Sequence, residues 1–145
     1  MKKSCLLLFL LTISLSSEAS IQEARKLHQS GDKNRYPQLA AALVKEKMYF
    51  SAIPFIKEYL ASTSRVNDGA VDKVLDDLIT QVGVKQFEVL PANILEKSNA
   101  PTIRYILAKK AFRAGKFDQA IKHLNRRIED SHPVKPFALL LEASS

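Results

Sequence analysis

The chain has one cysteine, Cys5, which lies in a short apolar run near the start. Residues 20–145 therefore contain no cysteine, so that part of the chain has neither a disulfide framework nor a cysteine nucleophile. No later run approaches the roughly 20 apolar residues that a membrane-spanning helix needs. Apolar and polar residues do not alternate convincingly with a period of two anywhere, so we expect no β-sheet.

Catalytic signatures are also missing. The sequence has no glycine-rich phosphate loop, no G-x-S-x-G elbow and no H-E-x-x-H pair. His28, His123 and His132 are too scattered for two of them to share a helix turn as metal ligands. A carboxylate pair for glycoside chemistry stays open, although nothing in the sequence points to one. We therefore expect no enzyme, no cofactor and no metal site.

The first residues have the pattern of a secretory signal peptide. Lys2 and Lys3 precede an apolar run that ends at Leu15, and Ser17 and Ala19 supply small residues at the −3 and −1 positions of a cleavage site. An uncleaved anchor is the weaker reading, because the apolar run is about half as long as a membrane span. We expect residues 1–19 to be removed and the protein to be periplasmic or extracellular, with one helical domain at 20–145.

The formal net charge is +7, and the basic residues are unevenly placed. Asp118 is the only acidic residue between Pro101 and Ile128. The basic residues of that stretch are Arg104, Lys109, Lys110, Arg113, Lys116, Lys122, Arg126 and Arg127. This imbalance favours acidic partners. Earlier, Asp68, Asp72 and Asp76 share a helical spacing but lack the ligand spacing and central glycine of a calcium loop, so we interpret them as a solvated helix face.

Apolar residues recur with a helical period along most of the chain. Predicted helices cover about 35–47, 50–61, 101–114, 117–129 and 137–142, after a short first helix that starts at a Ser20–Glu23 capping box and ends at Gly31. Pro54 would lie in the first turn of its helix, where a missing N–H costs little. Between Val84 and Lys97, Pro91 separates two short helical pieces. The fold class is all-α.

Two segments share a set of core positions. Leu39, Ala40, Tyr49, Ala52 and Ile56 are matched by Leu107, Ala108, Phe117, Ala120 and Leu124. Each pair is 68 residues apart, which is twice the period of about 34 that is typical of helix–turn–helix repeats. The stretch 101–134 resembles a tetratricopeptide (TPR) repeat, and 33–66 resembles a weaker copy with Lys47 in place of the usual glycine and Tyr59 in place of a small residue. The alternative is an unrelated helical bundle, since such spacing is ordinary for a core.

The stretch 67–100 fits the TPR pattern poorly, because Gly83 and Gln86 stand at its aromatic and alanine positions. We interpret it as a degenerate repeat, the alternative being an insertion of matching length. Residues 135–145 would begin an incomplete fourth repeat. The resemblance implies antiparallel helix–turn–helix repeats stacked as a short right-handed solenoid.

The TPR resemblance also implies a scaffold for protein–protein interaction, with the partner on the concave face. The positions that line this face in the best copy are Thr102, Tyr105, Lys109, Phe112 and Arg113. Aromatic and cationic side chains together suit an acidic peptide or a terminal carboxylate. The simpler alternative is that Tyr105 and Phe112 pack against neighbouring helices while the charges face solvent.

The apolar helix from Phe137 to Leu141 is a second expected contact, because it lacks the polar face of a capping helix. Two other functions remain open. The chain could bind an anionic envelope polymer or lipid head groups through Lys109, Lys110, Arg113, Lys116, Arg126 and Arg127, or it could be the N-terminal part of a longer protein with a catalytic domain. Nucleic acid is disfavoured because the leader directs the chain out of the cell.

Overall fold

The computed structural model describes residues 21–64, 66, 68–124 and 128–144, and all regular structure in those residues is helical. The predicted all-α class is confirmed. The predicted signal peptide lies outside the described residues, as does Ser20 of the predicted capping box. Among the described helices, none combines the length and the apolar character needed to cross a membrane. The chain forms two compact units, Met1–Tyr59 and Leu60–Ser145.

The first unit begins with a helix at residues 21–29, after which Gly31 adopts a positive φ of 64°. Asp32 accepts a hydrogen bond from the Asn34 N–H and caps η1 (Lys33–Arg35). Two longer helices follow, α2 (Tyr36–Lys45) and α3 (Tyr49–Ser62). The ring of Phe55 meets the rings of His28 and Tyr36 edge to face, with centroid distances of 5.3 and 5.4 Å. These aromatic contacts join α3 to α2 and to the helix at residues 21–29.

Pro54 is in the second turn of α3, because the helix begins at Tyr49. The prediction that it lies in the first turn is therefore wrong. A proline at this position removes the N–H donor for the carbonyl of Phe50. Both residues are exposed, so water can take the place of that donor.

The turn from α2 to α3 has the same hydrogen bonds as a turn in the second unit. After α2, the N–H of Lys47 bonds to the carbonyl of Val44, and the N–H of Met48 bonds to that of Leu43. This is the Schellman pattern, which needs a left-handed residue, usually glycine. Lys47 fills that position with φ 60°. Lysine therefore takes the place of the usual glycine without changing the conformation of the turn.

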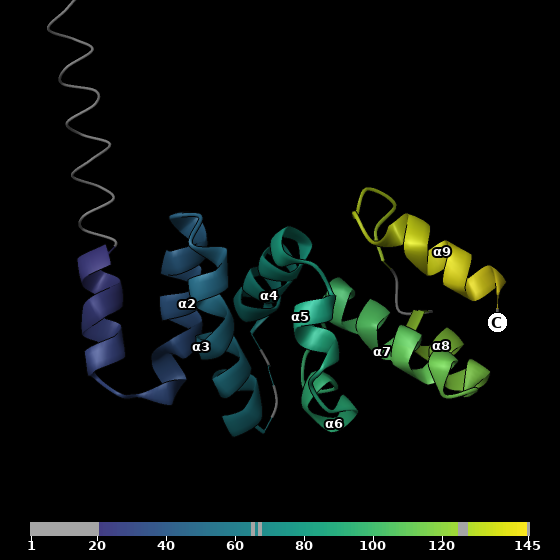
Figure 1. Ribbon diagram of the computed structural model, residues 1–145, viewed down its shortest axis with the longest axis horizontal. Helices are drawn as coiled ribbons and strands as arrows, with labels where there is room; N and C mark the ends of the chain where they lie inside the picture. The colour runs from purple at the N-terminus through teal and green to yellow at the C-terminus, as the bar shows by residue number, and fades with distance from the viewer. Residues whose placement is uncertain (1–20, 65, 67, 125–127, 145) are drawn as a thin grey trace, which may run out of the picture. The chain divides into compact units, whose positions relative to one another are not determined.

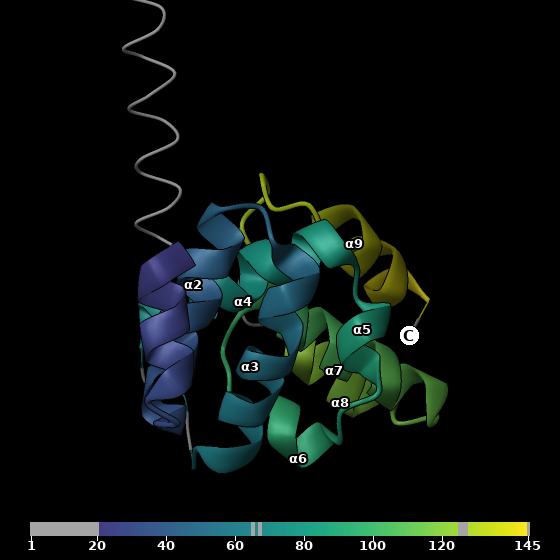
Figure 2. The ribbon, with the colours of Figure 1, turned by 60° about the vertical axis from the view of Figure 1, so that its left-hand side comes forward.

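The second unit contains six labelled helices (Figures 1 and 2). They are α4 (Gly69–Val82), α5 (Lys85–Glu88), α6 (Ala92–Leu95), α7 (Pro101–Arg113), α8 (Phe117–Leu124) and α9 (Lys135–Ala143). As predicted, Pro91 separates two short pieces, which are α5 and α6. Helix α7 is central to this unit, because it contacts α4, α5, α6, α8 and α9. Its buried side chains are Thr102, Ile103, Ile106, Leu107, Ala108 and Ala111.

Helices α7 and α8 are joined by the second Schellman turn. Gly115, with φ 71°, donates to the carbonyl of Phe112, and Lys116 donates to that of Ala111. Ala108 and Ala120 are both 0% exposed, so small residues lie where the two helices come close. The sequence placed Phe117 among the matched core positions. It is instead 44% exposed and rests edge to face on Phe112, with 5.4 Å between centroids.

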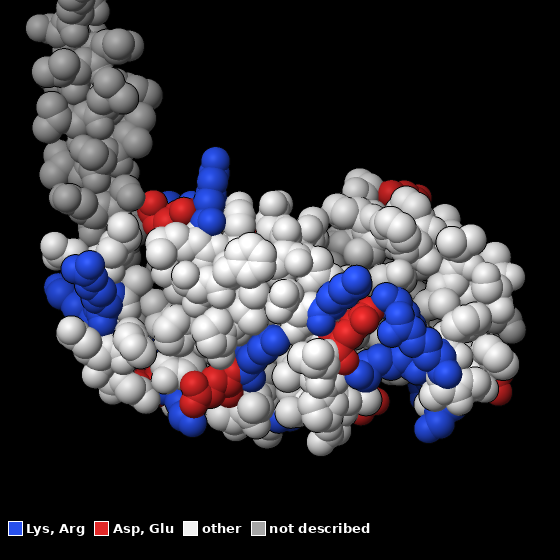
Figure 3. Space-filling view, in the orientation of Figure 1, with Lys and Arg blue, Asp and Glu red and all other residues white. Residues whose placement is uncertain are grey.

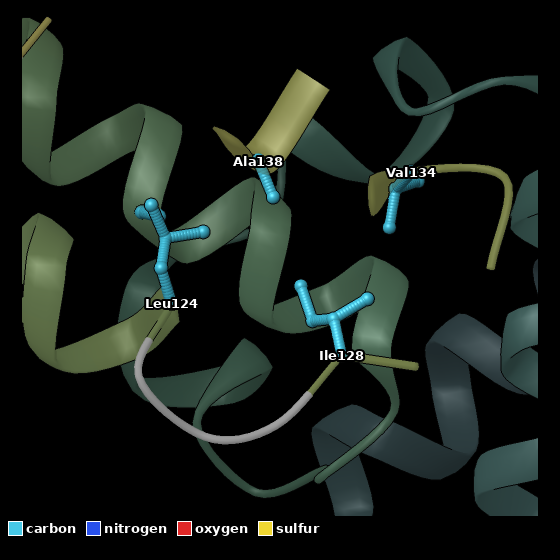
Figure 4. Close-up of a cluster of buried hydrophobic side chains, with 5 residues drawn as sticks. Leu124, Ile128, Val134 and Ala138 are labelled. Carbon is cyan, nitrogen blue, oxygen red and sulfur yellow. The ribbon is translucent and has the colours of Figure 1, made fainter. Parts of the chain in front are cut away.

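Helix α9 joins the α7–α8 hairpin through a small apolar cluster (Figure 4). The side chains of Leu124 and Ile128 point toward those of Val134 and Ala138, and the fifth member is Ala108. All five residues are less than 9% exposed. The start of α9 is therefore fixed against α7 and α8 by apolar packing.

Two carboxylates of α4 hold the start of α7, which corrects their interpretation as a solvated face. Asp72 accepts hydrogen bonds from the Ser98 hydroxyl at 2.6 Å and the Asn99 N–H at 3.2 Å. Asp76 accepts one from the Thr102 N–H at 2.9 Å. Helix α7 has no side-chain cap of its own, so Asp76 satisfies one N–H of its first turn, while Asp72 holds the segment just before it. Asp68, in contrast, caps its own helix: it is the N-cap of α4 and accepts a hydrogen bond from the Ala70 N–H.

Candidate functional site

Four of the five predicted partner-binding residues line one cavity of about 310 Å³, which we name the α7–α9 groove. Tyr105, Lys109, Phe112 and Arg113 come from α7, at spacings that place them on one helix face. The opposite wall is formed by Phe137, Leu140 and Leu141 of α9 and by Ser144, which follows the helix. The sequence predicted the face of α7 and the apolar surface of α9 as two separate contacts. The fold brings them together in one groove.

Thr102 does not belong to the groove. Its side chain is 0% exposed and lines a neighbouring cavity instead, so the groove brings together only the other four predicted residues. The physical reason is its position at the start of α7, on the side that packs against α4, where its N–H reaches Asp76. Its buried hydroxyl has no hydrogen-bond partner.

The aromatic residues of the groove are partly in contact with one another. Tyr105 lies 6.3 Å from Phe137 between centroids, so one ring from each wall meets across the groove. Phe112 stacks edge to face on Phe117. The apolar surface of α9 remains accessible, with Phe137 58% exposed and Leu140 68% exposed. Two accessible apolar side chains beside cationic ones are typical of a surface that binds a partner.

Glu88 is the residue that sequence reasoning missed. It ends α5, and its carboxylate bonds to Lys109 Nζ at 2.5 Å and lies 3.5 Å from Arg113 Nη1. Its backbone carbonyl accepts from Lys110 Nζ at 2.7 Å. Lys109, Lys110 and Arg113 thus all contact Glu88, which lies 21 or more positions earlier in the chain. No local spacing relates α5 to α7, so the sequence carried no signal for this contact.

The surroundings of Glu88 are protected from solvent. Its side chain is 16% exposed and that of Lys109 is 25% exposed, whereas that of Arg113 is 61% exposed. The hydrogen bond from Lys109 lowers the pKa of Glu88 below its ordinary value of 4.5, against the opposing effect of burial, and the charge of Arg113 lowers it further. Figure 3 shows basic atoms gathered around a small acidic patch over α5 and α7. The positive charge of the groove is therefore partly compensated, and Arg113 has the most accessible cation.

A second cavity, of about 250 Å³, adjoins the groove, and we name it the apolar pocket. It shares Tyr105 and Phe137 with the groove. Its other lining residues are Ile79, Thr80, Gly83, Val84, Thr102, Pro133 and Val134. None of the described residues that line it is charged at neutral pH, which distinguishes it from the groove.

His132 and Asp76 fix the loop that leads into α9. The Val134 N–H donates to His132 Nδ1 at 3.2 Å, and Nε2 of the same ring bonds to Asp76. With Nδ1 accepting, the ring donates from Nε2. Asp76 therefore contacts both the start of α7 and the loop before α9, the two helices that wall the groove. His132 lies in a turn and is partly exposed, and its position in the chain gave no sign of the contact with Asp76.

A third cavity, of about 370 Å³, has a polar lining that includes Arg104, Lys122 and His123. It contains none of the predicted partner-binding residues. No group of three or more potential metal ligands occurs among the described residues. Arg126 and Arg127, which the sequence analysis assigned to a polymer-binding surface, lie outside the described part of the chain.

No protein-family model, curated protein or solved structure matches this chain.

Proposed function

We propose that this protein is an exported TPR-like helical scaffold that binds an acidic segment of a partner protein in the α7–α9 groove. The observation that carries the proposal is the groove itself: four residues selected for an acidic peptide from the sequence line one cavity with accessible apolar side chains of α9. Export rests on the N-terminal pattern of residues 1–19. A secreted or periplasmic form that retains Met1–Ala19 would refute that step.

Three features support the TPR-like architecture. The positions Lys47 and Gly115 are 68 residues apart, adopt the same left-handed conformation and close the same pair of hydrogen bonds. Ala52 and Ala120, also 68 apart, are both fully buried. The segment between the hairpins contains one full helix, α4, and then only the single turns α5 and α6. This is the form expected of a repeat whose second helix has degenerated.

The charges of the groove favour an acidic partner over a neutral one. Among the described residues, Lys109 and Arg113 are the only charged ones that line it. Arg113 keeps an accessible guanidinium, which can form charge-assisted hydrogen bonds with a carboxylate even while Glu88 remains in place. The accessible rings and leucines would bury apolar side chains of the same segment.

Charge reversal at Arg113 tests this function. The probes are two fluorescent decapeptide pools of Gly, Ser, Ala, Leu and Phe, with one Asp per peptide in the first pool and one Lys in the second. We expect the protein to bind the Asp pool and not the Lys pool. Arg113→Glu should weaken binding of the Asp pool about tenfold or more, since attraction becomes repulsion.

Lys122→Glu is the matched control, because it makes the same change in charge at an exposed lysine that lines the polar cavity instead of the groove. It should change peptide affinity less than about twofold. Equal weakening by the two variants, together with equal weakening of binding to phosphatidylglycerol vesicles, would replace the peptide proposal by the anionic-surface alternative. Failure of the Asp pool to bind better than the Lys pool would refute both.

A further inference from the structure

The groove and the apolar pocket differ in charge although they share a wall. Lys109 and Arg113 line the groove, whereas the pocket has no charged lining residue. A carboxylate gains from charge-assisted hydrogen bonds in the first cavity and would lose its hydration without compensation in the second. An apolar side chain gains by burial in the second. The two cavities therefore suit different parts of one ligand.

The pocket has room for a side chain. Its volume of about 250 Å³ is several times the roughly 30 Å³ that one water molecule occupies in the liquid. Its walls come from α4, α7 and the segment that leads into α9. The hydrogen bonds of Asp76 to Thr102 and His132 hold these elements together, so the pocket does not depend on a ligand to form.

Helix α7 sets the distance between the two cavities. Tyr105 marks their shared wall and Arg113 marks the cationic end of the groove. At about 1.5 Å of rise per residue, these positions are roughly 12 Å apart along the helix. An extended peptide advances about 3.3 Å per residue, so it covers that distance in three or four residues.

We infer that the partner segment is extended and carries one large apolar residue about three or four positions from an acidic residue, with the apolar side chain in the pocket and the carboxylate at Arg113. This inference rests on the proposed function, because it specifies the ligand of the same groove. It adds a second contact site, the apolar pocket, and a spacing rule that acidity alone does not give.

A spacing series tests the rule. The probes are fluorescent nine-residue peptides of Gly and Ser, acetylated and amidated, with one Leu and one Asp that are one, three, four or seven positions apart. Peptides with spacings of three or four should bind most tightly. The advantage should be at least about tenfold over a spacing of one, which is too short to reach both sites, and about threefold over a spacing of seven, which must form a loop to reach both. Fluorescence polarisation measures the dissociation constants.

Filling the pocket gives the second arm of the test. Thr80 is exposed and lines the pocket, so Thr80→Phe should block it and remove the advantage of the favoured spacings. Gln81→Phe adds the same ring to the next residue of α4, which is also exposed but does not line the pocket, and should leave the series unchanged. Circular dichroism confirms that each variant keeps its helices.

Affinity that is the same at all four spacings, with the Asp pool still preferred over the Lys pool, would overturn the inference and leave the proposed function standing. A spacing preference that survives Thr80→Phe in a folded variant would also overturn it, because the leucine would then bind elsewhere. If neither the Asp pool nor any peptide of the series binds, the proposed function fails first.

Discussion

The α2–α3 hairpin and the α7–α8 hairpin have the same turn in different surroundings. Both turns close with the same two backbone hydrogen bonds around a left-handed residue, Lys47 in one and Gly115 in the other. The second hairpin also contacts α9 and faces the carboxylate of Glu88. The local geometry of a hairpin thus follows from its own residues, while a binding surface needs groups from other elements.

The ion pairs of the two units differ in the same way. Lys33 and Glu58 lie 2.8 Å apart with side chains that are 54% and 47% exposed. Lys109 and Glu88 lie 2.5 Å apart with side chains that are 25% and 16% exposed. An exposed pair contributes little to stability, because solvent screens it, whereas a protected pair is costly to break.

The largest expected effect is on the buried alanines of the hairpins. Ala120→Leu and Ala52→Leu should each lower the free energy of unfolding by about 1–3 kcal/mol, because a larger side chain overpacks a site that has no free space. Both residues are 0% exposed. Ala61→Leu, at an exposed position of α3, is the control and should have little effect. Urea denaturation measures all three. Tolerance at one hairpin alone would show that the two are packed differently.

Breaking the protected ion pair should have the next largest effect. Glu88→Gln should lower stability by about 1–2 kcal/mol at pH 7, because hydrogen bonds to a charged group are lost. Since the folded-state pKa of Glu88 is depressed below 4.5, its contribution is full above that pH and is lost as the pH falls through the folded-state pKa. The wild type and the variant should therefore converge in acid.

Chemical denaturation between pH 7 and pH 3 measures this difference, with Lys33→Gln as the exposed counterpart, for which we expect no measurable change. A gap between wild type and Glu88→Gln that stays constant down to pH 3 would show that the carboxylate is not stabilised by Lys109 and Arg113.

Exchange of the two turn residues should have the smallest effect. Gly115→Lys should destabilise the protein by about 1 kcal/mol and Lys47→Gly should stabilise it by a similar amount, because side chains disfavour the left-handed conformation. A Cβ at Gly115 would meet no atom within 4 Å, so the cost comes from the backbone alone. Thermal unfolding checks both variants, and shifts of the same sign would refute equivalence of the turns.

The helices were predictable because they depend on neighbouring residues. The apolar period located α2, α3, α7 and α9 to within about two residues, the usual uncertainty of helix ends. The glycine at 115 marked the end of α7 through its backbone freedom. The prediction for Pro54 was wrong for a local reason. It started α3 one residue late, at Phe50, and counted the proline as part of the first turn.

The site was only half predictable, because its parts are distant in the sequence. The face of α7 was selected from the positions that the TPR resemblance implies, but Glu88 reaches it from α5 and Phe137 reaches it from α9. Thr102 was included as one of those positions, yet it is buried and lines the apolar pocket instead of the groove. Nor could spacing reveal that Asp76 would accept from Thr102 and His132, since those contacts span 26 and 56 residues.

The position of Asp76 has a mechanical consequence. One carboxylate holds the first turn of α7 and the loop before α9, so both walls of the groove are attached at the same end to the same residue of α4. Further along α9, Leu141 packs against the apolar cluster that contains Ala108 of α7 and Leu124 of α8. A substitution at Asp76 would therefore alter the positions of both walls of the groove at once, whereas a substitution at Lys109 or Arg113 would alter one wall alone.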